Sequence, residues 1–252
     1  MIKILTAYVL TAAIKDRILL LYAGLIVVII SLSLFFGSSS ATEQDQFSYV
    51  FTSGAMRIAS AFTLITFIVF YFRRSFENRD VDFLFSRPIT RLQFVMSHFF
   101  AFSIMAFLIA IITTLSILFI TGGNHSAAVI FWGISIFSEL VVLSAVAMFF
   151  GVALSTAVSA TLITFCFYML ARLMGDIIGI LGNGISNLAT EILGKIMILI
   201  SFFIPRLDLI GQTSWLVYGV GEFNYLVVYT QIIIFLGLIL SATYLDLRRR
   251  QF

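Results

Sequence analysis

Long apolar stretches separated by short polar segments form the dominant pattern along this chain. A helix needs about 20 apolar residues to cross the hydrocarbon core of a bilayer. Five stretches qualify: 18–36, 56–72, 94–121, 128–154 and 225–245. A sixth, 161–181, is apolar apart from Arg172 and Asp176. Because every backbone polar group in lipid must be bonded internally, the pattern predicts an all-α polytopic membrane protein with six transmembrane helices.

Composition points the same way. Hydrophobic residues make up 61% of the 252 residues and charged residues 11%, against about 45–50% and about 25% in ordinary soluble domains. A single soluble core cannot hide such an apolar excess, which excludes ordinary soluble folds. No repeat or linker divides the chain, so we expect residues 1–252 to form one transmembrane domain. The net charge of +3 is small, and we expect no nucleic-acid partner.

The positive charges indicate an orientation. Lys and Arg gather in the N-terminal segment, in the loop after the second apolar stretch and at the C-terminus. Residues 37–54 and 122–126 contain neither. Since cytoplasmic loops carry an excess of Lys and Arg, we predict a multi-pass protein of the cell (inner) membrane with both termini in the cytoplasm.

The first sixteen residues have the pattern of an amphipathic helix. Lys3, Thr11 and Lys15 share one helical face, and Ile2, Leu5, Val9 and Ala12 share another. This arrangement predicts an interfacial helix over residues 1–16 that leads into the first span. A cleavable signal peptide is the alternative, although the apolar run that follows is longer than a usual signal core.

Residues 182–224 are harder to interpret. The apolar stretch 192–204 is interrupted by Lys195 and followed by Pro205, and a seventh crossing would place the C-terminal arginines outside. We therefore expect an external helical segment here. Whether 188–204 is re-entrant, interfacial or a seventh span stays open. Trp215 and Tyr218, just before the last span, are expected to be interfacial anchors.

The loop between the second and third spans, residues 73–91, is charged and too long for a simple turn. Ser75 is a candidate N-cap with Glu77 in the first turn, and Ser86-Arg87-Pro88 is a candidate helix stop. Val81, Leu84 and Phe85 would form an apolar face between charged residues. An exposed helix of this kind fits a groove on another protein. The alternative is an interfacial helix whose arginines reach anionic headgroups.

A family resemblance rests on the end of this loop. The run Asp82-Phe83-Leu84-Phe85-Ser86-Arg87-Pro88-Ile89-Thr90-Arg91 resembles the signature of ABC-2 type transporter permeases. In that family an acidic and hydrophobic helix ending in Leu-Leu-Ser-x-Pro-x-Ser/Thr-Arg joins the second and third spans. The N-terminal interfacial helix, the six spans and the external helical segment also resemble the family. The pair Arg79-Asp80 departs from the Gly-Thr that is common there.

The resemblance implies the permease subunit of an ATP-driven exporter. Residues 73–91 would be the coupling helix, seated in a cleft of a separate cytoplasmic ATPase subunit that is present in two copies and binds ATP and Mg. A second permease copy, identical or related, would complete the path. No Gly-x-x-x-x-Gly-Lys-Ser/Thr phosphate loop occurs in this chain, so we expect it to bind no cofactor and to lack ATPase activity. The expected partner contacts are Glu77, Val81, Asp82, Leu84, Phe85, Arg87, Pro88 and Arg91.

Four ionisable residues within the spans are candidate functional positions, because such residues are costly in lipid. Glu139 lies near the middle of the fourth span, Arg57 near the outer end of the second, and Arg172 and Asp176 in the fifth. Arg172 and Asp176 stand four residues apart and can pair on one helical face. These charges either hold helices in register or line the translocation path. The family resemblance favours Arg57, Arg172 and Asp176 as path-lining over Glu139.

Catalytic and metal-binding patterns are absent from the sequence. His98 and His125 are isolated, no Gly-x-Ser-x-Gly elbow occurs, and Cys166 lies in an apolar run typical of an inert core thiol. We therefore expect no catalytic residue and no metal site. Two alternatives to a permease remain: a polytopic membrane enzyme acting on a lipid-linked substrate, and a non-transporting membrane anchor that recruits a cytoplasmic partner.

Overall fold

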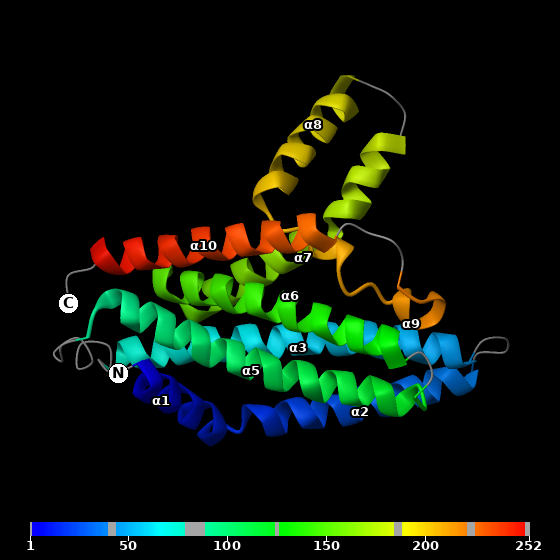
Figure 1. Cartoon of the computed structure of the whole chain (residues 1–252), viewed down its shortest axis with the longest axis horizontal. Helices are drawn as coiled ribbons and strands as arrows, with labels where there is room; N and C mark the ends of the chain where they lie inside the picture. The colour runs from blue at the N-terminus through cyan, green and yellow to red at the C-terminus, as the bar shows by residue number, and fades with distance from the viewer. Residues whose placement is uncertain are drawn as a thin grey trace.

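A computed structural model of the chain describes residues 2–39, 44–78, 89–123, 126–183, 188–220 and 225–249, and its regular elements there are all helical. Most of the helices lie side by side in an elongated bundle (Figure 1). In chain order the elements are α1 (Ile2–Lys15), α2 (Ile18–Ser39), α3 (Gln44–Glu77), α5 (Arg91–Ile120), α6 (Ser126–Ala153), α7 (Ala157–Asn183), α8 (Leu188–Phe203), the 3₁₀ turn η1 (Leu207–Leu209), α9 (Trp215–Tyr218) and α10 (Tyr225–Arg249).

Six of these helices are long and apolar enough to cross a membrane, as the sequence predicts: α2, α3, α5, α6, α7 and α10. The most apolar windows of α3 and α6 are each 67% buried, whereas those of α2 and α10 are 22% and 17% buried. Therefore α3 and α6 form the centre of the bundle, and the rest of the chain leaves most of the surface of α2 and α10 uncovered.

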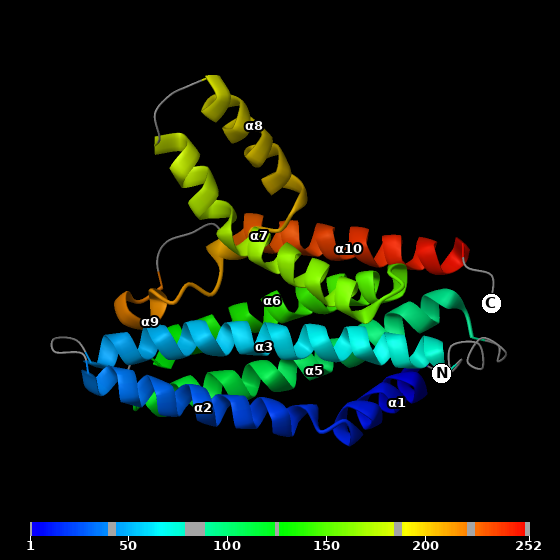
Figure 2. The ribbon, with the colours of Figure 1, turned by 180° about the vertical axis from the view of Figure 1, so that it is seen from behind.

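Both ends of the chain lie at one end of the bundle. Helix α1 begins, and α10 finishes, at the end where α3 finishes and α5 begins (Figures 1 and 2). An even number of crossings gives this arrangement. The side of the membrane that this end faces stays a prediction, and we call it the inner end.

Helix α3 is longer than the sequence pattern predicts. The expected external loop, 37–54, is largely helical, because α2 continues to Ser39 and α3 begins at Gln44. At about 1.5 Å per residue, the 34 residues of α3 span about 51 Å. Its polar outer part packs against α2: Ser33 Oγ donates to the Ser48 carbonyl at 3.2 Å, and Thr52 Oγ1 donates to Ser33 Oγ at 2.6 Å. Hydrogen bonds from hydroxyl groups thus hold the outer part of α3 against α2, in the segment where the sequence is too polar to be predicted as part of a span.

Helix α1 has the two faces that its sequence predicts. Leu5 and Val9 are buried against the bundle, and Lys3, Thr11 and Lys15 are exposed. Thr6 Oγ1 donates to the Ser97 carbonyl of α5 at 3.2 Å. The apolar face of α1 therefore packs on protein as well as leading into α2.

The inner end of α3 corrects one prediction. Ser75 is not an N-cap, because α3 continues unbroken to Glu77, whose carboxylate lies 3.5 Å from the guanidinium of Arg73. Ser75 lies inside α3, because the helix that contains the preceding hydrophobic run continues past it. The other predicted coupling residues, Val81, Asp82, Leu84, Phe85, Arg87 and Pro88, lie outside the described residues.

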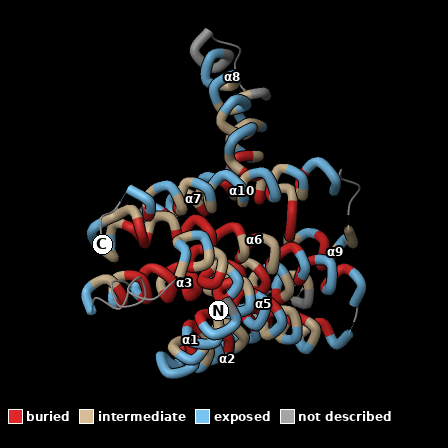
Figure 3. The backbone as a smooth tube through the Cα atoms, turned by 60° about the vertical axis from the view of Figure 1, so that its left-hand side comes forward, coloured by how far each residue is buried: buried red, intermediate tan, exposed pale blue. Residues whose placement is uncertain are grey.

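Helix α8 packs beside the end of α7 as a helical hairpin that projects from the bundle (Figures 1 and 2). It has 16 residues, about 24 Å at 1.5 Å per residue, which is short of the roughly 30 Å hydrocarbon thickness. It is therefore not one of the six spanning candidates. Most of its described surface is exposed or intermediate (Figure 3), and the exposed side chains include Ile192, Leu193, Ile198, Leu199 and Phe202.

Candidate functional site: a buried charge cluster and the turn it holds

Three charged side chains from three helices meet inside the bundle. Arg57 of α3 places Nε 3.8 Å from Glu139 Oε2, and Arg172 of α7 places Nη1 3.9 Å from the same oxygen. The side chain of Glu139 is fully buried, while those of Arg57 and Arg172 are 8% and 17% exposed. Glu139, near the middle of α6, therefore joins α3 to α7 through one carboxylate.

Aromatic side chains surround this cluster. The guanidinium carbon of Arg57 lies 5.7 Å from the ring centroid of Trp132, close enough for a cation–π interaction. Tyr168 is buried on α7, one helical turn before Arg172. Both rings are buried, so the charges lie among packed side chains.

Arg172 is bonded mainly to backbone. Its Nη1 donates to the carbonyls of Leu207 and Ile210, the latter at 2.7 Å, and its Nη2 donates to the Gly211 carbonyl at 3.2 Å. Two arginines facing one carboxylate leave a positive excess in a region of low dielectric, which is costly without compensation. The three carbonyl dipoles supply that compensation at Arg172.

The three carbonyls belong to residues 204–218, which return the chain from α8 toward α10 and which we call the inserted turn. Pro205 follows α8, η1 and α9 are single helical turns, and Gly211 has φ of +58°. Leu207, Ile210 and Leu216 are fully buried. Irregular backbone at membrane depth is tolerated only where protein or a water-filled cavity satisfies its polar groups. Arg172 meets that requirement here.

Two glycines allow the inserted turn to approach the bundle closely. Gly211 packs on the cluster, since a Cβ at this position would lie 3.3 Å from Arg57 Nη2. Gly175, three residues after Arg172 on α7, faces the turn, and a Cβ there would overlap the Asp208 carboxylate. Asp208 pairs with Arg206 at 2.7 Å. Arg172 and Gly175 thus form one docking face of α7.

Gln231 of α10 holds the start of the turn. Its Nε2 donates to the carbonyls of Ser201, Phe202 and Ile204 at 2.7, 3.3 and 3.1 Å. Its Oε1 accepts the Arg206 N–H at 3.3 Å. Gln231 was not among the predicted site residues, although a lone amide in the apolar run 225–240 is a usable signal for a polar contact within a membrane helix.

The structure corrects the predicted pairing of Arg172 with Asp176. Both residues are described, and no ion pair joins them; Asp176 is exposed on α7. Arg172 turns instead toward the backbone of the inserted turn and toward Glu139. Arg57 is also deeper than predicted, because the outer extension of α3 places it level with Glu139 rather than near a helix end.

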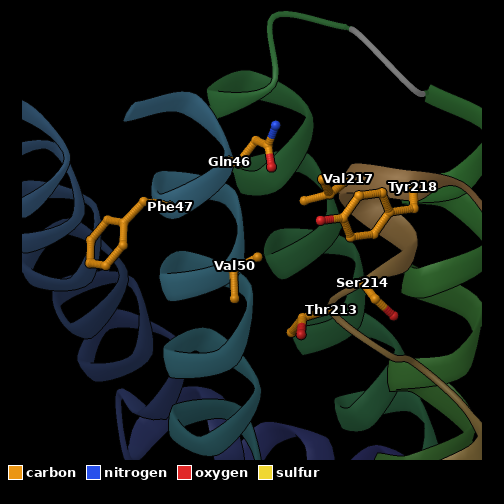
Figure 4. Close-up of a pocket in the computed structure, with 7 residues that line it drawn as sticks. All are labelled: Gln46, Phe47, Val50, Thr213, Ser214, Val217 and Tyr218. Carbon is orange, nitrogen blue, oxygen red and sulfur yellow. The ribbon is translucent and has the colours of Figure 1, made fainter. Parts of the chain in front are cut away.

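An open groove of about 500 Å³ lies between α3 and the part of the inserted turn that carries α9 (Figure 4). Trp215 is 4% exposed, so its predicted role as an interfacial anchor is wrong, whereas Tyr218 is 84% exposed. In Figure 4 the ring of Tyr218 reaches toward α3. The lining residues are Gln46, Phe47, Val50, Thr213, Ser214, Val217 and Tyr218.

At the inner end, Thr90 and Arg91, the last two residues of the run Asp82–Arg91, are held by hydrogen bonds. Thr90 caps α5 through a reciprocal pair with Gln93, in which Gln93 N–H donates to Thr90 Oγ1 at 3.3 Å and Thr90 N–H donates to Gln93 Oε1 at 3.2 Å. Arg91 Nη1 donates to the Leu247 carbonyl near the end of α10. Arg91, predicted as a partner contact, therefore also joins α5 to α10.

Metal-ligating and nucleophilic groups are sparse in the described part of the chain. Among the described residues, no three His, Cys, Asp or Glu side chains are grouped to hold a metal ion. Cys166 is exposed on α7, which corrects its predicted place in the core. His98 is buried against the rings of Phe72 and Phe94 and places Nδ1 2.8 Å from the Phe94 carbonyl.

Comparisons with known proteins give no family: no protein-family model matches the chain, and no curated protein matches its sequence.

Proposed function

We propose that this chain is the permease subunit of an ATP-driven exporter of the ABC-2 type, which forms the translocation path and receives its energy from a separate ATPase subunit. The observation that carries the proposal is the run Asp82–Arg91, which resembles the coupling signature of that family and ends at the first residue of α5. The six apolar helices provide a membrane domain of the required size.

The connections at the inner end support a mechanical role for this loop. Residues 78–90 connect α3 to α5, and the first residue of α5, Arg91, is bonded to Leu247 of α10. A partner that displaces the loop would therefore act on α3, α5 and α10 together. Coupling needs this kind of attachment, because a freely hinged loop would move without moving the helices.

The buried charge cluster gives α3 a rigid link to α6 and α7. Arg57 and Glu139 are buried in the packed interior of the chain, which favours a structural role for them over direct contact with a substrate. We propose that they keep α3, α6 and α7 together as the path opens. Motion received by α3 would then reach α7 and the inserted turn.

Asp176 supports assembly with another molecule. It is an exposed carboxylate on a largely apolar helix whose other charge, Arg172, is bonded elsewhere, and such a group in a membrane needs water or a polar partner. We propose that Asp176 faces either the translocation path or a second permease copy.

The test is binding of the proposed ATPase partner by a Leu84→Ala, Phe85→Ala double variant, with the chain in lipid nanodiscs. If both side chains dock in an ATPase cleft, burial of about 1.5–3 kcal/mol each gives a loss in affinity of roughly two orders of magnitude or more. ATPase stimulation should fall with binding. Both are measured by copurification and by ATP hydrolysis.

The matched control is Phe107→Ala, Leu108→Ala, which removes the same two side-chain types from the exposed surface of α5. It should leave ATPase binding unchanged. Unchanged binding and stimulation in the loop variant would refute the coupling role. Turnover of a lipid-linked substrate by the chain alone would instead identify a membrane enzyme. ATPase binding without ATP-dependent transport would identify an anchor.

A further inference from the structure

The environment of the Arg172 guanidinium has the features of a cation-binding site. The carbonyl oxygens of Leu207, Ile210 and Gly211 accept its hydrogen bonds, and Glu139 Oε2 lies 3.9 Å from Nη1. Four oxygen atoms from two separate parts of the chain thus face one planar cation. A guanidinium group has five N–H donors in a fixed plane, which matches several acceptors at once.

We infer that the inserted turn is held to the bundle by a guanidinium-binding site, which Arg172 fills from within the chain, and that the turn separates from the bundle when this site is empty. Arg172 is then a positioning residue. The inference concerns this chain alone and does not depend on the proposed transport function.

Backbone chemistry explains why apolar packing is not enough to hold the turn. Leu207 and Ile210 are fully buried, so their carbonyls cannot find water while the turn is docked. A buried carbonyl without a donor loses several times the free energy of a typical exposed hydrogen bond. The Leu207 carbonyl also accepts the Ile210 N–H at 3.4 Å, but the Ile210 carbonyl regains a partner only when the turn undocks toward a hydrated surface.

The rest of the site is held independently of Arg172. Glu139 is also paired with Arg57, whose guanidinium rests against the Trp132 ring. Gly211 approaches Arg57 and Ser135 closely, so the turn has its own contacts with α3 and α6. Shortening residue 172 should therefore leave Glu139, α3 and α6 in place, so that the turn can dock again around a free guanidinium ion and re-form the site. A free guanidinium ion is the ligand expected to fill it.

The experiment measures exposure of the turn by cysteine labelling in nanodiscs. Cys166 is first replaced by Ala, since it is exposed and would react. Leu216→Cys reports on a fully buried position of the turn, and Ser214→Cys on an exposed position two residues away. Maleimide labelling rates are compared with Arg172 intact, with Arg172→Ala, and with Arg172→Ala in guanidinium chloride well below denaturing concentrations.

With Arg172 intact, Leu216→Cys should react slowly. In Arg172→Ala its rate should rise by about tenfold or more, as expected for the loss of hydrogen bonds from a charged donor. Guanidinium should restore slow labelling, whereas tetramethylammonium chloride at the same concentration should not, because it has no N–H donor. Arg172→Lys should restore only part of the protection, since a single ammonium cannot span the three carbonyls.

Three results would overturn the inference. The first is equal protection of Leu216→Cys with and without Arg172. The second is a faster rate that guanidinium fails to reverse. The third is an equal guanidinium effect on Ser214→Cys, which would show an action on the reagent. If Arg172→Ala is not obtained folded, Arg172→Gln replaces it, and the yield of monodisperse protein is also measured with and without guanidinium. A yield that depends on guanidinium supports the site. A yield that guanidinium leaves unchanged overturns the inference.

Discussion

Two arginines, Arg172 and Arg91, donate to backbone carbonyls in different surroundings. Arg172 lies inside the bundle, bonds three carbonyls and pairs with the fully buried Glu139. Arg91 is half-buried at the inner end and bonds one carbonyl, that of Leu247, near the last residues of α10. The chemistry of the contact is the same, but the number of acceptors and the depth differ.

Depth determines what each contact contributes. Within the bundle, no solvent replaces a lost donor, so without Arg172 the Ile210 and Gly211 carbonyls would remain unpaired and Glu139 would keep only Arg57. At the inner end, Leu247 is fully buried as well, but its carbonyl lies in the last turn of a helix beside the half-buried Arg91, whose removal admits water. Removing the two arginines should therefore have effects of very different size.

The largest effect is expected for Arg172→Leu. The change leaves three carbonyls without their donor and Glu139 with one long ion pair. Breaking a buried charge pair by removing one partner costs about 3–5 kcal/mol. The free energy of unfolding, measured in mixed micelles by titration with a denaturing detergent, should fall by that amount.

Asp176→Asn is the matched control for this prediction, because Asp176 lies one helical turn away on α7 and is exposed. It should change the free energy of unfolding little. A double variant, Arg172→Leu with Glu139→Gln, should be less destabilised than the sum of its single variants, since each removes a charge that the other compensates. Full additivity would mean that the two residues do not form a pair.

The next effect in size is expected for Gln231→Leu. This change keeps the side-chain volume but removes the amide that bonds Ser201, Phe202 and Ile204. Loss of a neutral donor to partly buried carbonyls should cost about 1–3 kcal/mol, less than loss of the charged Arg172. Thr230→Ala, at the exposed neighbouring position, is the control. Equal effects of Thr230→Ala and Gln231→Leu on the free energy of unfolding would remove the role of Gln231.

The bundle itself could be predicted from the sequence, because each span is a local property of about 20 consecutive residues. The buried face of α1 followed from the spacing of Leu5 and Val9 in the same way. The outer extension of α3 could not be predicted from hydropathy. Its hydroxyl residues look polar in a window average, and only their pairing with Ser33 of α2 makes them helix-forming contacts.

The candidate site was predictable only in part. The cost of a charge in lipid identified Glu139, Arg57 and Arg172 as special positions. Their partners were not predictable, because Arg172 bonds a turn more than thirty residues later in the chain rather than Asp176 four residues away. Helical spacing shows which residues share a face, but not whether that face meets an irregular backbone.

A smaller effect is expected for Arg91→Ala. The change removes a charged donor from one carbonyl at the end of α10, where water can take its place, so the free energy of unfolding should fall by only about 1 kcal/mol. Amide hydrogen exchange in the last turn of α10 should accelerate, because Arg91 no longer fixes it to α5. Arg248→Ala, in the same turn, is the control. If amide exchange in the last turn of α10 is unchanged in Arg91→Ala, then Arg91 does not link α5 to α10.

The smallest effect is expected at the surface pair between Asp16, just after α1, and Arg74 of α3. Arg74 Nη1 lies 2.9 Å from Asp16 Oδ1, but the side chains are 65% and 32% exposed. Water and salt screen such a pair, and exposed pairs contribute about 0.2–1 kcal/mol. A double-mutant cycle with Asp16→Asn and Arg74→Gln should give a coupling energy in that range, and the coupling should shrink further at high salt. A coupling energy as large as that between Arg172 and Glu139 would mean that exposure does not set the strength of charge pairs in this protein. The difference in depth between the inserted turn and the inner end would then not explain the difference between Arg172 and Arg91.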